Sequence, residues 1–283
     1  MKCGMSLVLM GAMLLGSCVP ASRQESPVVY GAGSGTLTVA TGSPGELGLL
    51  KVLAEEFSRE NDVRILWRKA GTGESLQLLQ DRRADVIMVH APAAEKQAVS
   101  EGWATHRTLI GSNEFFLVGP GDDPAQVQAA KTAAEAYQQI ARSQAKFFSR
   151  ADNSGTHQKE MAVWQKAGIA PGGSWYIRTH DFMMPTLLRA DAERGYFMTD
   201  SSTWVVGKHQ VSNLKLLFKG DPFIVNVYHA YCQPAGATAG AALAAKFVDF
   251  LATEKAQQMI REYGKDRHGE GLYNDASYAQ QFE

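Results

Sequence analysis

The chain has 283 residues, 45% of them hydrophobic, and a formal net charge of −1. This length and apolar content are enough for a globular protein with two lobes. The lysines and arginines are scattered along the chain, so a basic face for nucleic acid or another polyanion is not expected. No nucleic acid is therefore predicted among its partners.

Residues 1–17 have the pattern of a bacterial lipoprotein signal peptide. Lys2 precedes an apolar run over residues 5–15, which is too short to span a bilayer. The sequence Leu15-Gly16-Ser17-Cys18 resembles the cleavage box in front of a lipidated cysteine. We predict that Cys18 becomes a lipidated amino terminus that anchors the protein to a bilayer outside the cytoplasm, in the periplasm or at the cell surface. A plain secretory signal with a chance cysteine is the alternative.

Residues 18–35 are rich in Ser, Pro and Gly and have little apolar periodicity, which predicts a flexible tether between the lipid and the folded part. Cleavage removes Cys3 and lipidation uses Cys18, so Cys232 has no partner for an internal disulfide. We expect Cys232 to be buried as a small hydrophobic residue in an apolar strand.

Strands and helices alternate through the next part of the chain. Thr36 to Ala40, Val63 to Lys69 and Asp85 to Val89 have the pattern of strands, and apolar residues at helical spacing follow the first two. This alternation predicts an α/β fold with an open sheet, in which ligands gather at the carboxyl ends of the strands. His90 lies at such an end, where we expect it to pack under a loop rather than to contact a ligand.

Glycine-rich turns follow the first two strands. Hydroxyls and backbone N–H groups at the start of a helix suit a negatively charged ligand. The candidate ligand residues of these turns are Thr41, Gly42, Ser43, Gly71, Thr72 and Gly73. For either turn alone, a tight connection without a ligand is the alternative, and a third turn of the same kind favours the ligand.

That third turn lies within residues 147–160. An apolar strand ends at Ser149, the turn after it supplies helix-capping side chains, and a helix is predicted to begin near Thr156. The predicted ligand donors are Arg150, Ser154, Gly155 and Thr156. Donors without competing acceptors suit a small, fully ionised oxyanion. For Arg150, a surface salt bridge with Asp152 is the alternative.

Two apolar strands, Glu114 to Gly119 and Phe223 to Tyr231, are placed to cross between the lobes. The predicted division assigns residues 36–116 and 224–283 to a first lobe and residues 117–223 to a second. Each lobe is expected to be an open mixed sheet flanked by helices. Two crossings form a hinge, and a ligand that touches both lobes stabilises the closed state.

The Arg150 stretch resembles the signature of the tungstate-binding components of ABC transporters. The matching residues are Ser149, Arg150, Asp152, Ser154, Gly155, Thr156, His157, Lys159, Glu160, Trp164, Ala167 and Gly168. Further matches are Gly71-Thr72-Gly73, Val89-His90-Ala91-Pro92, Val118-Gly119-Pro120, Ser174-Trp175-Tyr176 and Thr199-Asp200. The resemblance implies a two-lobed protein similar to type II periplasmic binding proteins. Such a protein would hold tungstate or molybdate between its lobes and deliver it to an ABC permease, as a monomer without a cofactor.

The first turn departs from that family, whose members tend to carry a run of Thr and Ser after the first strand. Gly42, Pro44 and Leu47 stand where hydroxyls would be expected, and Pro44 also lacks an N–H. Glu46 would repel a dianion if it pointed into the cleft, whereas pointing outward it would favour the helix amino end. We favour the outward orientation, with backbone N–H groups replacing the lost hydroxyls. Sulfate, phosphate or a small organic acid as ligand, and a sensor lipoprotein without transport, remain open.

Catalysis is not predicted. Ser154 lacks the G-x-S-x-G setting of a nucleophile elbow, and His157 with Glu160 gives H-x-x-E without a second histidine. Neither a serine hydrolase nor a zinc peptidase is indicated, and no metal is expected. Asp200 opens a turn that resembles the acidic turn of the family, but we favour an ordinary helix N-cap for it.

Overall fold

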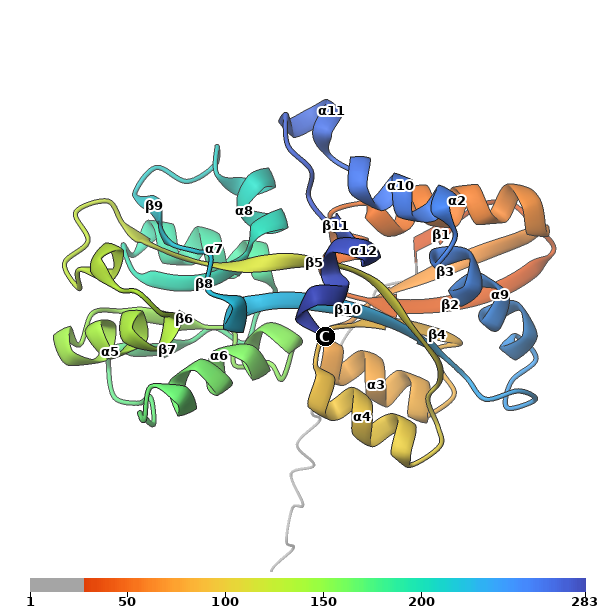
Figure 1. Cartoon of the computed structure of the whole chain (residues 1–283), viewed down its shortest axis with the longest axis horizontal. Coiled ribbons are helices and arrows are strands. Elements are labelled where there is room, and N and C mark those ends of the chain that lie inside the picture. The colour runs from red at the N-terminus through yellow and green to blue at the C-terminus, as the bar shows by residue number, and fades with distance from the viewer. Residues whose placement is uncertain (1–27) are drawn as a thin grey trace, which may run out of the picture.

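The structure is a computed structural model that describes residues 28–283. The predictions for the signal peptide, for Cys18 and for the tether up to residue 27 lie outside these residues. Figure 1 shows two α/β lobes side by side, joined by long strands. Mixed sheets flanked by helices make up both lobes, which confirms the predicted fold class.

The first lobe, on the right of Figure 1, is built on a mixed sheet in the order β1-β3-β2-β4-β10-β5. Strand β2 runs parallel to β3 and β4, whereas β10 runs antiparallel to β4 and β5. The strands are β1 (Val28–Tyr30), β2 (Gly35–Thr41), β3 (Val63–Lys69), β4 (Val86–Val89), β5 (Thr105–Pro120), β10 (Val225–Cys232) and β11 (Asn274–Asp275). The helices are α1 (Ser43–Glu46), α2 (Leu49–Asn61), α3 (Thr72–Gln80), α4 (Pro92–Ser100), α9 (Ala241–Leu251), α10 (Glu254–Glu262), α11 (Lys265–His268), α12 (Ala276–Ala279) and the 3-10 turn η3 (Gln280–Phe282).

The second lobe surrounds the far half of β5. There β5 pairs antiparallel with β8 and β9, and β6 lies parallel between β8 and β7. The strands are β6 (Phe147–Ser149), β7 (Tyr176–Arg178), β8 (Tyr196–Asp200) and β9 (Leu214–Phe218). The helices are α5 (Ala133–Ser143), α6 (Gly155–Lys166), α7 (Met183–Ala192), α8 (Ser201–Gly207) and the 3-10 turns η1 (Val127–Ala129) and η2 (Pro222–Ile224).

The first strand corrects the predicted tether. Val28–Tyr30 pairs antiparallel with β3, and β2 begins at Gly35, so the tether prediction is wrong for residues 28–30 and for residue 35. Tyr30 is buried in the core of the first lobe. Three residues give too short a pattern to recognise from sequence, because a strand this short depends on its partner strand for its hydrogen bonds.

The two lobes meet where β5 and β10 cross. Glu114 of β5 still pairs with Val225 of β10, and the next residue, Phe115, already pairs with Asp200 of β8. At the crossing, the side-chain amide of Asn226 donates to Asn113 Oδ1 at 2.7 Å. Both connections therefore lie next to one another, as a hinge requires. We keep residues 36–116, 117–223 and 224–283 as the proposed limits of the lobes.

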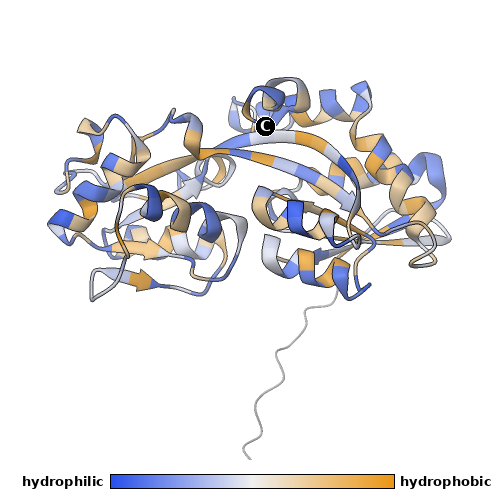
Figure 2. Cartoon of the chain, turned by 60° about the horizontal axis from the view of Figure 1, so that its bottom comes forward, coloured by the Kyte–Doolittle hydropathy of each residue, from blue (hydrophilic) through white to orange (hydrophobic). Residues whose placement is uncertain are grey.

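Each lobe has its own hydrophobic core. In the first lobe, Phe57 packs edge-on against Phe247, and in the second, Trp164 packs against Phe147. Figure 2 shows hydrophobic and hydrophilic residues alternating around the helices, as one-sided burial demands. Cys232 is buried and unpaired in the first core, which confirms its predicted packing. Among residues 28–283, no helix combines the length and apolar character needed to cross a bilayer.

Candidate functional site

The turn between β6 and α6 has the structure that its sequence predicts. Ser154 is the N-cap of α6, where its hydroxyl accepts from the backbone N–H of His157 at 3.3 Å and donates to Asp152 Oδ1 at 2.6 Å. Ala151 and Asn153 take positive φ angles of 49° and 57°, so the sharp bend does not use Gly155 as its flexible residue. The helix begins at Gly155, one residue before the predicted start. Ser154, Gly155 and Thr156 are all buried at this helix end.

Arg150 is held rigidly behind this turn. Only 4% of the residue is exposed, its Nη2 donates to Asp152 Oδ2 at 2.5 Å, and its Nε donates to the carbonyl of Asp181 at 3.1 Å. The salt bridge with Asp152 that was the alternative for Arg150 does exist, and its two sides differ, because 5% of the Arg150 side chain is exposed against 21% of that of Asp152. Asp152 also accepts from the backbone N–H of Ser154. The carboxylate therefore fixes both the cation and the turn.

The first lobe brings a second helix start to the same place. Gly71 is the N-cap of α3, and Thr72 is buried with its hydroxyl accepting from the backbone N–H of His90 at 3.4 Å. A Cβ atom on Gly71 would lie 3.2 Å from Cβ of Ser154, and one on Gly73 would lie 2.6 Å from Nδ2 of Asn153. The amino ends of α3 and α6 thus face one another in contact. Two positive helix ends at this distance are best stabilised by a negative group that both can reach.

His90 lies against both helix ends, through its backbone N–H at Thr72 and its ring at Gly155. Its ring centre lies 4.8 Å from that of Tyr228, and a Cβ atom on Gly155 would lie 2.4 Å from its Cε1. Burial lowers the pKa of His90 to about 4, and the positive charge of Arg150 adds to this effect against the opposing charge of Glu95. His90 is therefore buried in its neutral form against the start of α6. Its inaccessible Nδ1 has no hydrogen-bond partner among the described residues.

The turn after β2 offers fewer free side-chain donors for a ligand than its sequence predicts. The hydroxyl of fully buried Thr41 donates to the carbonyl of Met88 at 2.9 Å, so it ties β2 to β4. Gly42 is the N-cap of α1, and Oγ of Ser43 lies 3.4 Å from Oδ2 of Asp200 in the other lobe. Helix α1 spans only Ser43–Glu46. Ser43 is thus the side chain of this turn that the structure brings to the second lobe.

Glu46 pairs with Lys69, a residue that the sequence analysis missed. Their Oε1 and Nζ atoms lie 2.7 Å apart, with 17% and 33% of the two side chains exposed. Glu46 is close enough to the cleft to help raise the pKa of Asp200, an effect that is chiefly due to the burial of Asp200. A carboxylate with its own cation repels an anion much less than a free one. Lys69 is the last residue of β3 and comes directly before a glycine-rich turn, so its position in the sequence could have marked it as a candidate site residue.

Asp200 is an N-cap, as expected, and also a contact between the lobes. Its carboxylate accepts from the backbone N–H and from the hydroxyl of Thr203, both at 2.8 Å. Asn113 of the crossing strand donates to the same carboxylate at 3.3 Å. Asp200 is fully buried, so this acceptor is fixed at the inner end of the cleft next to Ser43.

A buried carboxyl group below the Arg150 turn gives the protein a pH-dependent stability. Glu160 accepts from the hydroxyl of Tyr176 at 2.6 Å and from Nε1 of Trp164 at 3.2 Å. Burial raises the pKa of Glu160 to about 7, although these hydrogen bonds favour the charged form. The folded state then holds this proton more tightly than the unfolded chain, in which the pKa is close to 4.5.

The contribution of Glu160 to stability is consequently complete below a pH of about 4.5 and is lost as the pH rises to about 7. Its size is roughly 3 kcal/mol at about 1.4 kcal/mol per pKa unit. We expect Glu160→Gln, which stays neutral, to flatten this part of the curve of unfolding free energy against pH. Urea unfolding of both proteins from pH 4.5 to 8 measures the difference. Parallel curves for the two proteins would show that Glu160 ionises normally.

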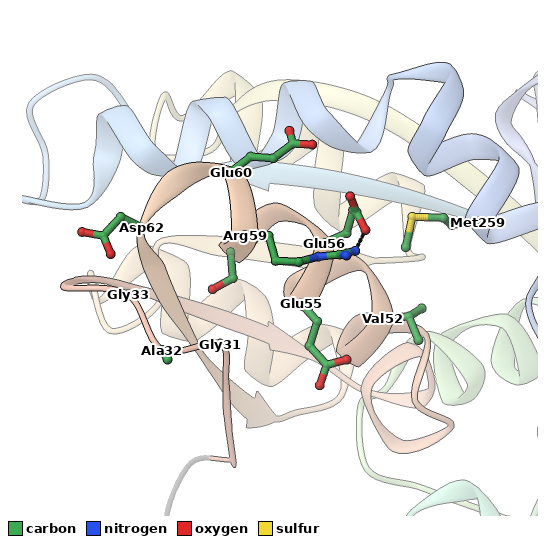
Figure 3. Close-up of a pocket in the computed structure, with 11 residues that line it drawn as sticks. Gly31, Ala32, Gly33, Val52, Glu55, Glu56, Arg59, Glu60, Asp62 and Met259 are labelled. Carbon is green, nitrogen blue, oxygen red and sulfur yellow. Dashed lines mark ion pairs between the residues drawn. The ribbon is translucent and has the colours of Figure 1, made fainter.

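A hollow of about 940 Å³ lies far from these turns, between α2 and the segment Gly31 to Gly33 (Figure 3). Four carboxylates line it, from Glu55, Glu56, Glu60 and Asp62. Arg59 pairs with Glu56 across the helix surface. Within residues 28–283, no group of three acidic, histidine or cysteine side chains is arranged to hold a metal ion. An acidic, open hollow of this kind does not suit an anion, so the meeting helix ends of α3 and α6 are kept as the candidate anion site.

The chain is similar to known proteins in sequence and in fold. A family model described as the PBP superfamily domain matches residues 29–255. The tungstate-binding protein TupA of Peptoclostridium acidaminophilum is 33% identical over 271 residues, which cover 94% of each chain. The crystal structure of the tungstate ABC transporter from Geobacter sulfurreducens superposes with a TM-score of 0.74 at 34% identity, over 82% of this chain and 100% of that one. The tungstate-binding protein TupA of Desulfovibrio alaskensis G20 gives a TM-score of 0.70 at 33% identity, over 86% of this chain and 99% of that one.

Proposed function

The chain belongs to the tungstate-binding proteins of ABC transporters within the periplasmic-binding-protein superfamily, and we propose that it captures a tetrahedral oxyanion between its lobes, tungstate or molybdate first. The observation that carries this proposal is the meeting of the amino ends of α3 and α6 beside the buried guanidinium of Arg150. Backbone N–H groups from both lobes and a fixed cation gather on that side, where the one carboxylate of the turn, Asp152, already accepts from Arg150 and Ser154.

In this proposal the ligand contacts come from both lobes. The proposed donors are Gly42, Ser43, Gly71, Thr72, Gly73, Arg150, Gly155 and Thr156, and Ser154 positions their turn, because its hydroxyl and its backbone N–H already donate to Asp152. Thr41 stays with them as the residue that fixes the first turn, because its own proton is used by Met88. Gly42, Pro44 and Leu47 offer no hydroxyl, so backbone N–H groups carry more of the binding in the first lobe.

The protein delivers the captured anion to an ABC permease, in keeping with the transporters to which its relatives belong. Lipidated Cys18 would hold it as a monomer on the outer side of a membrane, where the permease can sense lobe closure. No catalytic step is needed for this role. If the protein only sensed the anion, deletion of its gene would leave anion transport unchanged, whereas loss of transport would support the proposed role.

A ligand panel tests the proposed function. Thermal-shift and calorimetric titrations of the full chain with tungstate, molybdate, sulfate, phosphate and small carboxylates compare the candidates directly. We expect tungstate and molybdate to bind most tightly and to raise Tm, because a ligand at a hundred times its Kd stabilises the folded state by about 2.7 kcal/mol. Binding of small carboxylates alone would restrict the relationship with the tungstate-binding proteins to the fold.

Phosphate is the second candidate because the cleft also contains an acceptor. Asp200 is buried next to Ser43, and a carboxylate there can accept the proton that phosphate carries near neutral pH. The same panel separates the two candidates, since tungstate and molybdate carry no proton at pH 8. A preference for phosphate over tungstate at pH 6 to 8 would favour this second candidate.

A further inference from the structure

Phe182 stands at the start of α7 and meets one cation from each lobe. Nζ of Lys69 lies 3.9 Å from the centre of the Phe182 ring, and the guanidinium carbon of Arg150 lies 5.5 Å from it. Lys69 is the last residue of β3 in the first lobe, whereas Phe182 and Arg150 belong to the second. The Lys69–Phe182 contact therefore joins the lobes, and a cation at this distance from an aromatic face is attracted by the ring.

Phe182 is held in place by the turn that carries the proposed anion donors. Nε of Arg150 donates to the carbonyl of Asp181, the residue before Phe182, at 3.1 Å. The backbone N–H of His180 donates to the carbonyl of Arg150 at 2.9 Å. Any shift of Arg150 towards or away from a bound anion is thus transmitted directly to the ring.

Lys69, in the first lobe, is held in place by its ion pair with Glu46. Its ammonium lies 2.7 Å from Glu46, in the turn after β2, and 3.9 Å from the Phe182 ring. The Lys69 side chain is 33% exposed, whereas the side chain of Arg150 is only 5% exposed. The Lys69–Phe182 contact therefore lies nearer to solvent than the guanidinium of Arg150, which is proposed to bind the anion. This is the position expected of a contact that closes the entrance to the anion site.

We propose that Lys69 and Phe182 form a latch over the oxyanion cleft that slows release of the bound anion; this inference rests on the proposed function of the same site. The contact exists only while the lobes are together, so it stabilises the closed state and not the open one. Its loss should raise the dissociation rate and leave the association rate nearly unchanged. The energy of a cation–aromatic contact corresponds to a change of roughly three- to thirtyfold.

Stopped-flow fluorescence with tungstate as the probe measures both rates, with Trp67 as the reporter because its indole donates to the carbonyl of Thr41 beside the cleft. We expect Phe182→Leu, which keeps the apolar volume, to dissociate roughly three- to thirtyfold faster than wild type. Lys69→Met should also dissociate faster, because it removes the same contact and leaves the charge of Glu46 without its cation. The double variant should be no faster than the quicker single variant, since both changes remove one contact. Rates equal to wild type for Phe182→Leu, or strictly multiplicative effects in the double variant, would overturn the latch.

Phe116→Leu is the matched control. Its ring lies 5.8 Å from Nζ of Lys219, and Phe116 pairs with Thr199 of β8 beyond the crossing, so this contact does not bring the two sheets together although residue 116 ends the proposed first segment, and the tungstate rates should not change. The latch and the proposed function can fail independently, and the radius of gyration measured without added anion distinguishes the two failures. If wild type binds none of the oxyanions, the proposed function fails, while an expansion of Phe182→Leu relative to wild type still supports the latch. An unchanged radius in that case rejects it.

Discussion

Arg150→Ala is expected to abolish measurable oxyanion binding in calorimetry while the protein stays folded. Arg150 is 4% exposed and its guanidinium is oriented by Asp152 and by the carbonyl of Asp181, so its geometry is already fixed before a ligand binds. One charge-assisted hydrogen bond contributes about 1.5–3 kcal/mol, or roughly ten- to a hundredfold in affinity. The variant also leaves the negative charge of Asp152 next to the site, which repels an anion and adds to the loss.

Arg150→Lys should give an intermediate affinity. A lysine keeps the charge but cannot bond Asp152, Asp181 and a ligand at once in the fixed fork of a guanidinium. Arg178→Ala is the matched control, because Arg178 is exposed and stands opposite Ser149 on the neighbouring strand. Circular dichroism and Tm confirm folding in each case. Tungstate affinity within threefold of wild type for Arg150→Ala would mean that Arg150 only braces the turn.

The helix ends of this site were predictable because their determinants are local. Ser154 caps α6 through a bond three residues along the chain, and such a bond is encoded in the spacing of Ser, Gly and Thr. Asp200 was predicted as a cap for the same reason. In the first lobe, Gly71 caps α3 where the sequence placed a turn after a strand.

Residues that act through distant partners were not predictable. The hydroxyl of Thr41 was expected to face a ligand, but it bonds Met88, 47 residues away, and no local pattern shows that choice. The contact between Lys69 and Phe182 depends on how the two lobes meet, which hydrophobic periodicity does not record. Gly155 was likewise predicted only as a ligand donor, whereas its small size is also needed against a histidine of the other lobe.

Gly155→Ala is expected to weaken oxyanion binding about five- to a hundredfold by preventing full closure of the lobes. The new Cβ would lie 2.4 Å from Cε1 and 2.5 Å from Nδ1 of His90. The His90 ring cannot move away freely, since its centre lies 4.8 Å from the ring centre of Tyr228 and 6.2 Å from that of Phe115. Forcing an extra carbon into such a contact costs about 1–3 kcal/mol, and only the closed state bears it because His90 belongs to the opposite lobe.

The unliganded variant should keep or slightly gain stability, because alanine favours helix more than glycine does. Loss of affinity without loss of Tm therefore distinguishes blocked closure from misfolding. Solution scattering should show less compaction of Gly155→Ala than of wild type when tungstate is added. Gly172→Ala serves as the control, since a Cβ there meets no atom within 4 Å, and both of its observables should match wild type. Wild-type compaction and affinity in Gly155→Ala would mean that the ligand is held without the α6 start approaching His90, and the proposed two-lobe site would have to be redrawn around the second lobe alone.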